Sequence, residues 1–264
     1  MNNSTDTSDT AAPPITASPP PVLGPTTPAV HMNWLDLFFL HWRIEPETMR
    51  ALVPEPLEID LFDASAWVAL VPFRMADCQF RGVPPIAPGV RNFYECNVRT
   101  YVRHRGLPGV WFFSLDAASL LPVLGGRWFW SLNYVHSRFE VTHERAHDLE
   151  RAHERCDYKL ARRRGPWADG RTHVAWRAGE PLPQAQPGSL EHFLTERYYF
   201  FTKRRGRVLA SRVEHEPWPL RQATVEHLDD TLIAAAGLSA EGEPHAMATD
   251  GVCVRGFNLF EPKP

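Results

Sequence analysis

The sequence predicts a β-rich α+β fold, in which a single antiparallel barrel or sandwich carries a few short helices at its periphery. Three observations lead to this class. Strand-like runs of apolar and alternating residues recur at short intervals from about residue 31 onward. The helical patterns between them are few and short. The chain of 264 residues is 44% hydrophobic and 22% charged, which is ordinary for a globular protein and excludes a collagen or a coiled coil.

The N-terminal segment differs from the rest of the chain. Residues 1–30 are rich in Ser, Thr, Pro and Ala and contain almost no large apolar side chains. Such a segment cannot bury enough surface to offset the entropy of ordering it, so we expect a disordered tail. It lacks the basic start and the apolar stretch of a signal peptide. We expect residues 31–264 to form one domain.

The ordered part begins with strands and continues mainly as strands. Apolar or alternating runs predict strands over residues 33–43, 57–62, 66–75, 93–103, 109–115, 128–134, 136–142, 198–203 and 208–215. Three pairs are expected to form hairpins, because turn residues separate their strands. These pairs are 57–62 with 66–75, 93–103 with 109–115, and 198–203 with 208–215.

Four short helices are expected between the strands. They cover residues 46–52, 116–124, 189–196 and 229–236. Pro46 suits the first turn of the first helix, and Ser189 suits the N-cap of the third. The pair Gly125-Gly126 is expected to end the second helix, and Gly237 the fourth.

Composition excludes several classes of partner and cofactor. The net charge is −3, so nothing indicates a general attraction to nucleic acid or to anionic membranes. No apolar run is long enough for a membrane-spanning helix, and the four cysteines form no CxxC pair. The chain contains no phosphate loop, dinucleotide fingerprint or nucleophile elbow. We therefore expect a cytoplasmic protein with a small-molecule ligand, no cofactor, and an oligomeric state that the sequence leaves open.

The clearest strand, residues 93–103, carries a polar stripe. Alternation places Glu95, Asn97 and Arg99 on one face, together with Tyr101 and Arg103. One interpretation is a solvent-facing stripe with cross-strand ion pairs. The other is the polar wall of a barrel lumen. There, a carboxyl such as Glu95 would have a raised pKa, and Arg99 would pair with a ligand carboxylate.

A second strand has a similar pattern. In residues 33–43, Leu37 and Phe39 share a face with His41 and Arg43, so a largely apolar stripe ends in two polar groups. His41 and Arg43 are therefore candidates for ligand binding. A single histidine in such a stripe is more often a structural residue.

Residues 143–147 match the zinc motif HExxH, and His153 stands at the spacing of a third ligand. On a helix, His143 and His147 would share one face. However, Glu150 replaces the glycine that lets the third histidine reach the metal, and the surrounding residues are densely charged. We expect no metal, and a zinc hydrolase is only a remote alternative.

Lysine is rare in this chain. Of 28 basic residues, the lysines are Lys159, Lys203 and Lys263, which lie in Arg-rich, turn-like stretches or next to the C-terminus. An imine-forming lysine needs an apolar or cation-crowded pocket that lowers its pKa. Catalysis through a lysine imine is therefore not expected.

Several stretches together resemble a known family. They are His41-Trp42-Arg43 with Pro46, AWVALVPFRM at 66–75, ECNVRTYV at 95–102, VWFFSLDA at 110–117, SLEHFLTERY at 189–198 and PWPLR at 217–221. The chain resembles the bacterial domain of unknown function 2071, also called the YqjF-like family, over about residues 32–237. The resemblance implies a fold similar to that of acetoacetate decarboxylase, a cone-shaped antiparallel β-barrel with a few flanking helices.

The resemblance also implies candidate site residues. The decarboxylase has a pocket glutamate, for which Glu95 is the match. The decarboxylase also has a stretch that begins with a glycine and an arginine and carries its imine-forming lysine. When this stretch is aligned without gaps so that its glycine and arginine match Gly126 and Arg127, the imine lysine aligns with Tyr134 and the next lysine with Val135. The resemblance therefore implies chemistry without lysine, of the lyase, hydratase or isomerase type, on a small organic acid, oxo acids included. The expected catalytic residues are Glu95, Tyr134 and His136, and the expected substrate-binding residues are Arg99, Arg43, His41 and Asn97. A non-catalytic binding or sensor protein on the same barrel is the alternative, so the sequence leaves open whether the protein is an enzyme.

Overall fold

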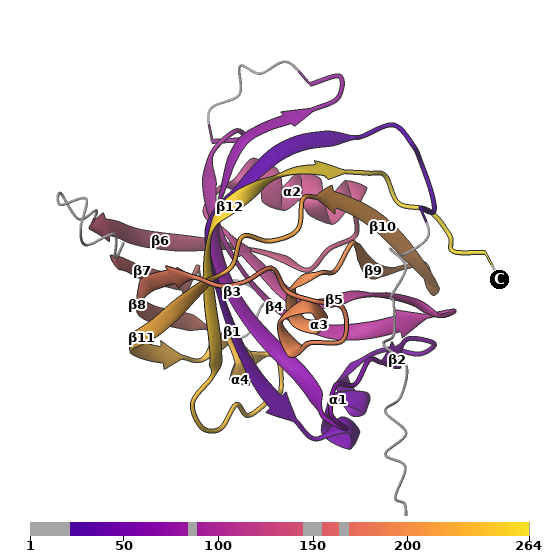
Figure 1. The fold of residues 1–264 in the computed structure, drawn as a ribbon. Helices are drawn as coiled ribbons and strands as arrows, with labels where there is room; N and C mark the ends of the chain where they lie inside the picture. The colour runs from indigo at the N-terminus through magenta and orange to yellow at the C-terminus, as the bar shows by residue number, and fades with distance from the viewer. Residues whose placement is uncertain (1–21, 84–88, 145–154, 164–168, 264) are drawn as a thin grey trace, which may run out of the picture.

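The computed structural model describes residues 22–83, 89–144, 155–163 and 169–263. Within these residues, twelve strands form one continuous sheet (Figure 1). The strands are β1 (Val30–Ile44), β2 (Glu58–Ile59), β3 (Ala66–Phe80), β4 (Phe93–His104), β5 (Leu107–Ala117), β6 (Tyr134–Glu144), β7 (Arg155–Arg162), β8 (Arg171–Pro181), β9 (Tyr199–Arg204), β10 (Arg207–His215), β11 (Arg221–Asp230) and β12 (His245–Gly256). The helices are α1 (Pro46–Leu52), α2 (Leu120–Phe129), α3 (Leu190–Thr195) and α4 (Leu232–Ala235).

The sheet closes on itself twice, because two of its strands, β5 and β12, each pair with two different strands along the same edge. The first of these strands is β5, in which Val110 and Trp111 pair with β9 and residues 115–117 pair with β6. In β12, residues 247–248 pair with β11 and residues 254–256 pair with β10. One closed ring therefore runs β5-β6-β7-β8-β11-β12-β1-β3-β4, and a second runs β5-β9-β10-β12-β1-β3-β4. All pairings are antiparallel except β5–β6 and β5–β9, so the predicted antiparallel barrel is confirmed apart from these two contacts.

The strands β1, β3 and β4 belong to both rings, and each of their faces packs into a different core. Successive side chains of a strand point to opposite faces. Phe38 and Leu40 of β1 therefore join the core of the nine-stranded ring with Tyr158. Leu37 and Phe39 join the other core, inside the seven-stranded ring. Burial on both faces explains why β1 and β3 have near-continuous apolar sequences instead of strict alternation.

Local signals predict several elements correctly. Helix α1 begins at Pro46, and α3 is capped by Ser189, whose side chain accepts a hydrogen bond from the backbone nitrogen of His192. The hairpins β4–β5 and β9–β10 form as predicted. Helix α4 is shorter than predicted, because Asp229 and Asp230 are still part of β11.

The predicted hairpin of residues 57–62 with 66–75 is wrong. Strand β2 has only two residues, and it pairs with Val102 and Arg103 of β4. Both edges of β3 are already occupied, by β1 on one side and by β4 on the other. Only a single bridge, between Phe62 and Ser65, remains of the predicted hairpin.

The helix predicted over 116–124 is displaced along the chain. Residues 116 and 117 complete β5, and α2 includes the two glycines that were expected to end it. A Cβ atom on Gly126 would lie 2.3 Å from the Tyr134 ring, so the glycine serves close packing instead of a helix end. Because α2 extends to Phe129, the strand predicted over 128–134 does not form.

Four strands were not predicted from the sequence: β7, β8, β11 and β12. In β7 the buried side chains of Cys156, Tyr158 and Leu160 do alternate with polar ones, but the charged residues around them hide this pattern. Residues 22–29, predicted as part of the tail, lie against the barrel. Leu23 donates its backbone N–H to the Tyr199 hydroxyl, and Arg212 binds the carbonyl of Pro25. The structured part of the chain therefore begins before residue 31.

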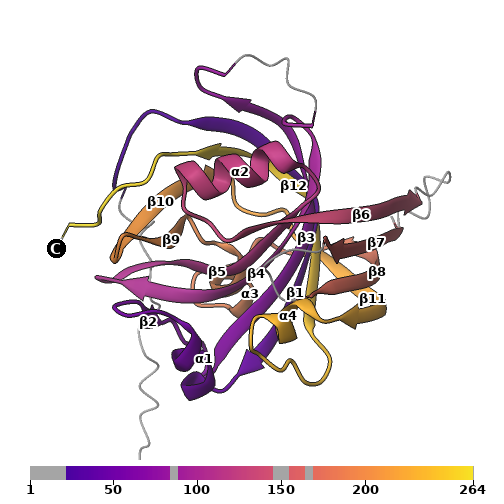
Figure 2. The same cartoon turned by 180° about the vertical axis from the view of Figure 1, so that it is seen from behind.

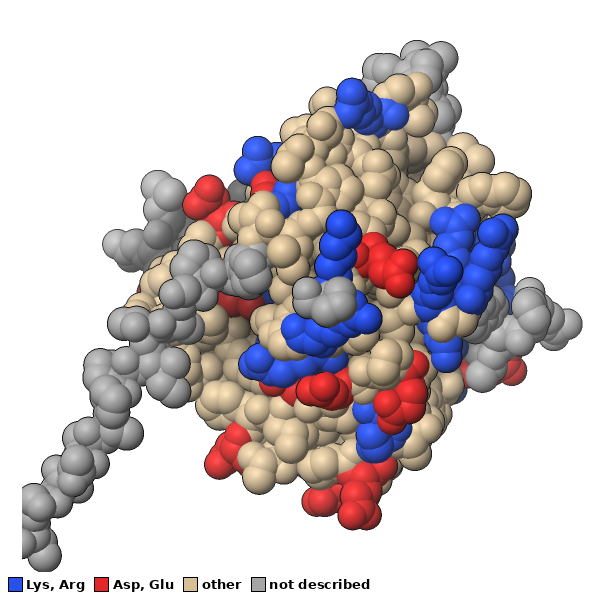
Figure 3. Space-filling view, turned by 90° about the vertical axis from the view of Figure 1, so that its right-hand side faces the viewer, with Lys and Arg blue, Asp and Glu red and all other residues tan. Residues whose placement is uncertain are grey.

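The described surface mixes charges of both signs. On the face drawn in Figure 3, basic and acidic side chains lie close together, with a larger basic group toward one side. None of the described helices is long and apolar enough to cross a membrane.

A buried ion pair fastens the strands around the division of β5. The Asp116 carboxylate of β5 accepts hydrogen bonds from Nε and Nη2 of Arg162 on β7, both at 2.9 Å. It also accepts one from the Ser137 hydroxyl of β6 at 2.7 Å. Both charged side chains are almost fully buried. One carboxylate therefore ties together the three strands where the nine-stranded ring leaves β5.

We expect Asp116→Asn to lower the free energy of unfolding by about 3–5 kcal/mol, because it replaces the buried carboxylate that pairs with the Arg162 guanidinium by a neutral amide. The matched control is Asp63→Asn, since Asp63 pairs with Arg43 at 3.0 Å but its side chain is 72% exposed. The control should lose less than about 1 kcal/mol. Urea denaturation of both variants measures the difference, and equal losses would contradict the role given to Asp116.

Candidate functional site

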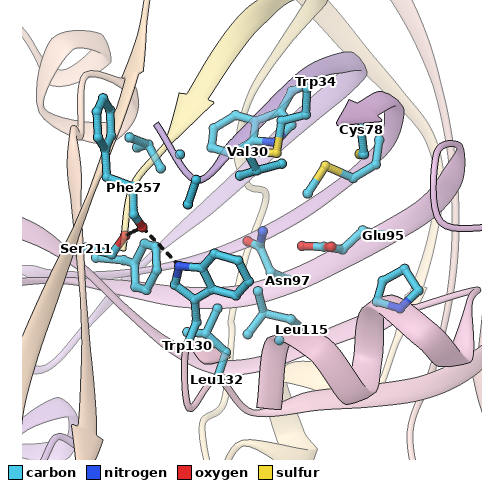
Figure 4. A pocket seen from close by; sticks show the side chains of 18 of the residues that line it. Val30, Trp34, Cys78, Glu95, Asn97, Leu115, Trp130, Leu132, Ser211 and Phe257 are labelled. Atoms are coloured by element: carbon cyan, nitrogen blue, oxygen red, sulfur yellow. Dashed lines mark hydrogen bonds between the residues drawn. The ribbon is translucent and has the colours of Figure 1, made fainter. Parts of the chain in front are cut away.

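The seven-stranded ring encloses a cavity of about 600 Å³. Strands β1, β3, β4, β5, β9 and β10 form its walls, and α2 lies across one end of the ring (Figures 2 and 4). Most of the lining side chains are aromatic or aliphatic, and a few polar groups converge on the space between them. A concave apolar cavity with a few convergent polar groups is the usual form of a small-molecule site.

The polar stripe of β4 faces this cavity. Glu95, Asn97 and Arg99 all line it, and Glu95 is only 2% exposed. The solvent-facing interpretation of these three residues is therefore wrong. In the close view, Glu95 and Asn97 point into the space between the Trp34 and Trp130 side chains (Figure 4).

Glu95 is paired with Tyr134. The two residues come from strands on opposite sides of β5, since Glu95 is opposite Ala117 and Tyr134 is opposite Leu115. The Tyr134 hydroxyl donates a hydrogen bond to Glu95 Oε2 at 3.0 Å.

This environment keeps Glu95 protonated. Burial raises the pKa of the Glu95 carboxyl to about 8, and the hydrogen bond from Tyr134 offsets only part of that effect. Burial, reinforced by Glu95 itself, also raises the pKa of Tyr134 well above its ordinary value. Near neutral pH the pair is therefore a neutral proton donor inside an apolar cavity.

Arg99 brings a positive charge to the cavity without a carboxylate partner among the described residues. Its Nη2 donates to the carbonyl of Leu194 at 3.4 Å, and the guanidinium lies 5.7 Å from the Phe39 ring centroid and 5.9 Å from that of Tyr101. Within the described part of the chain, Arg99 Nε and Asn97 Oδ1 are buried without a hydrogen-bond partner. Buried polar groups normally have partners, so these two atoms mark places where a ligand could supply one.

His41 does not line the cavity but supports its wall. Its Nε2 lies 2.8 Å from the Tyr101 hydroxyl, which in turn donates to the carbonyl of Leu194 at 2.8 Å. Because the tyrosine proton is used on Leu194, His41 Nε2 must be the donor to Tyr101. Burial, with the nearby Arg99 and His245, holds the pKa of His41 well below its ordinary value. A neutral His41 thus orients Tyr101 beside Arg99.

Two further predicted residues are not brought to the cavity. Arg43 lies on the surface, where it binds Asp63 and stacks at 4.7 Å from the Trp67 ring, because β1 extends beyond the cavity at this point. His136 is half-buried on β6 and does not line the cavity. After Tyr134, β6 continues into the nine-stranded ring and carries His136 with it.

The zinc motif is not helical where it is described. His143 and Glu144 are exposed residues at the end of β6, paired with Cys156 and Arg155. His147 and His153 lie outside the described residues. No group of three or more metal-binding side chains occurs in the part of the chain that the structure describes.

All three lysines are described, and none lines the cavity. Lys159, Lys203 and Lys263 are exposed, and Lys159 lies 3.4 Å from Asp157 on the outer face of β7. The position at which the resemblance places an imine lysine is occupied by Tyr134.

Sequence reasoning missed residues at the far end of the cavity. His215 lines it between the rings of Tyr198 at 4.7 Å and Trp218 at 4.8 Å, and burial lowers its pKa. Arg197 also lines the cavity, but it is paired with Asp60 at 2.6 Å. Alternation along the predicted strand 208–215 does place Val213 and His215 on one face, so a signal for His215 was present.

We expect Glu95→Gln to remove a pH dependence of stability. The folded pKa of Glu95 lies above its ordinary 4.5, so between these values the folded state binds one more proton than the unfolded state. Wild-type stability from this group then falls by about 1.4 kcal/mol per pH unit as the pH rises from about 5 to about 8. Over this range, the free energy of unfolding of Glu95→Gln should therefore rise relative to that of wild type.

Urea denaturation at several pH values measures this difference. Glu140→Gln, the same substitution at an exposed site on β6, corrects for the removal of one carboxylate from the chain. A difference between Glu95→Gln and wild type that does not change with pH would show that Glu95 is ionised in the folded state.

Comparisons with known proteins agree with this fold. The family model DUF2071, described as an uncharacterized conserved protein, matches residues 31–253. The uncharacterized protein YqjF of Bacillus subtilis strain 168 is 35% identical over 216 residues, which are 81% of this chain and 85% of that protein.

Similar solved structures are more distant in sequence. The enduracididine biosynthesis enzyme MppR complexed with pyruvate has a TM-score of 0.58 at 16% identity and covers 89% of each chain. An acetoacetate decarboxylase-like enzyme from Sphingomonas wittichii RW1 has a TM-score of 0.57 at 13% identity and covers 89% of this chain and 94% of that one. At these identities the two structures establish only the fold, an acetoacetate decarboxylase-like barrel. The family model and the relative establish the rest: the chain belongs to the DUF2071 family of YqjF-like proteins.

Proposed function

We propose that the protein binds an organic carboxylic acid in its barrel cavity, and that Glu95 in its protonated form exchanges a proton with the bound ligand. One observation carries this proposal. A buried, neutral Glu95–Tyr134 pair shares an aromatic cavity with Arg99, whose guanidinium has no carboxylate partner among the described residues. A proton donor and an anion-binding group are thus available on the same strand.

Arg99 is the group that holds the carboxylate of the ligand. Its charge-assisted hydrogen bonds are strong in a cavity lined mainly by apolar side chains, and Nε is a buried donor without a partner among the described residues. Asn97 lies between Arg99 and Glu95 on the same face, and its free Oδ1 accepts a hydrogen bond from a ligand hydroxyl.

Glu95 acts as the acid and then as the base. Its carboxyl donates a proton to a carbonyl oxygen or to an unsaturated carbon of the ligand, and the Tyr134 hydroxyl stabilises the carboxylate that remains. In an isomerase, a proton that leaves another position of the ligand then returns to the Glu95 carboxylate. In a hydratase, the oxygen of a water molecule bonds to the adjacent carbon of the ligand while a proton of that water goes to Glu95, and a lyase that removes water runs the same steps in reverse. This sequence corresponds to an isomerase, hydratase or lyase and needs no lysine.

Two further observations restrict the proposal. The three lysines lie outside the cavity, so the imine chemistry that the fold suggests has no lysine there. The structural neighbour MppR is named as a complex with pyruvate, which is an oxo acid. Oxo acids therefore belong among the ligands to be tested.

We expect Arg99→Gln to abolish binding of organic acids. Thermal unfolding against a panel of oxo, hydroxy and unsaturated acids measures this, because a ligand at 100 times its Kd adds about 2.7 kcal/mol of stability. Arg43→Gln is the matched control, since Arg43 was also predicted to bind substrate but lies on the surface. It should keep the stabilisation seen with wild type. Equal stabilisation of all three proteins would contradict the proposed role of Arg99.

We expect bound acids to exchange carbon-bound hydrogen for deuterium in heavy water with wild type but not with Glu95→Gln. Above about pH 8 the rate should fall, because Glu95 loses its proton there. Proton NMR of the ligand follows this exchange. Binding without any exchange in wild type would contradict the catalytic role and favour a non-catalytic binding protein.

A further inference from the structure

We infer that the ligand is an elongated amphipathic acid, bound with its carboxylate at Arg99 and its apolar chain extending past Glu95 to the end of the cavity under α2. The inference rests on the proposed function, because it takes Arg99 as the carboxylate-binding group. It names a substrate class that differs from the small oxo acid suggested by the sequence.

The first argument is the separation of the two functional groups. Glu95 and Arg99 are four residues apart on β4, and their pairing with Phe73 and Ala69 of β3 is continuous. At about 3.3 Å per residue, their Cα atoms lie about 13 Å apart.

The two side chains are held by different partners. Arg99 Nη2 donates to the carbonyl of Leu194 at 3.4 Å, and its guanidinium lies 5.7 Å from the Phe39 ring centroid and 5.9 Å from that of Tyr101. Glu95 is held by Tyr134. A three-carbon oxo acid spans only about 4 Å, at roughly 1.2 Å per bond of an extended chain. Such an acid is much shorter than the separation of about 13 Å between the two Cα atoms, which favours a longer ligand.

The second argument is the size of the cavity. A cavity of about 150 Å³ holds one benzene ring, so 600 Å³ accommodates roughly 20 non-hydrogen atoms. An unbranched acid with about 14 carbon atoms is about 16 Å long at the same advance per bond. It fills most of this volume, whereas a three-carbon acid leaves most of it empty.

The third argument is the difference between the two ends of the cavity. The end near Arg99 is closed by Phe39, Thr195 and Trp218, all of which are buried. The end beside Glu95 lies under α2, where the lining residues Leu121 and Phe129 are 55% and 65% exposed. At this rim, Leu121 and Phe129 are apolar, so an acid with its charged end at Arg99 places the far end of its apolar chain against apolar side chains of α2. Arg81, which also lines the cavity, is exposed to solvent.

The test uses straight-chain saturated acids from butanoate to hexadecanoate, with isothermal titration calorimetry as the readout. We expect the Kd to fall about fourfold with each added methylene until the chain reaches the rim, since burial of one methylene is worth about 0.8 kcal/mol. Pyruvate should bind more weakly than tetradecanoate, and tetradecanol should bind more weakly than the acid of the same length.

A pair of variants on α2 tests where the chain ends. Phe129→Glu places a charge on the rim and should weaken tetradecanoate at least about tenfold while leaving butanoate unchanged, because only the long chain reaches the rim. Trp128→Glu is the matched control, as Trp128 is the neighbouring residue, is 76% exposed and does not line the cavity. It should leave both affinities unchanged. Equal effects of the two variants on tetradecanoate would overturn the orientation.

The outcomes separate this inference from the proposed function. If the affinity does not increase with chain length but Arg99→Gln still abolishes binding of short acids, the elongated ligand is wrong and the carboxylate-binding role of Arg99 stands. If long acids bind equally well to wild type and Arg99→Gln, both the proposed function and the inferred orientation are overturned.

Discussion

The architecture depends on one constraint, which is that β5 divides an edge between β9 and β6. Because of this division, and a similar one in β12, the sheet forms two closed rings that share β12, β1, β3, β4 and β5. The nine-stranded ring is filled by its own aromatic core, whereas the seven-stranded ring keeps a cavity. The same division brings Glu95 and Tyr134 together, since they flank β5 from opposite sides. The buried Asp116–Arg162 pair holds the strands at this point.

The apolar cavity has different effects on the Glu95 carboxyl and the Arg99 guanidinium, for a physical reason. An apolar environment disfavours charge, and a carboxyl responds by keeping its proton, as the raised pKa of Glu95 shows. A guanidinium cannot lose its proton under these conditions. Arg99 instead places its charge beside two aromatic rings and a carbonyl oxygen. The cavity therefore combines a neutral proton donor with the positive charge of Arg99, about 13 Å away along β4.

Predictions from sequence succeeded where the signal is local and failed where two distant segments decide. Pro46 and Ser189 mark helix starts through their own backbone and side-chain chemistry, and the turn residues between β4 and β5 define that hairpin. Gly126 resembles a helix end, yet it lies within α2 because the Tyr134 ring packs against it. Strand β2 was paired with the wrong neighbour, since nothing local shows that β1 already occupies the edge of β3.

The sequence by itself determined the family, the strand-rich class and the set of residues on the polar face of β4, because alternation along one strand needs no knowledge of its neighbours. It could not decide whether that face meets water or a cavity. Tertiary structure decided this through the second ring, which covers the face and buries Glu95. It also selected Tyr134 over His136 and Arg99 over Arg43 as cavity residues, because strand pairing determines where each strand leaves the cavity.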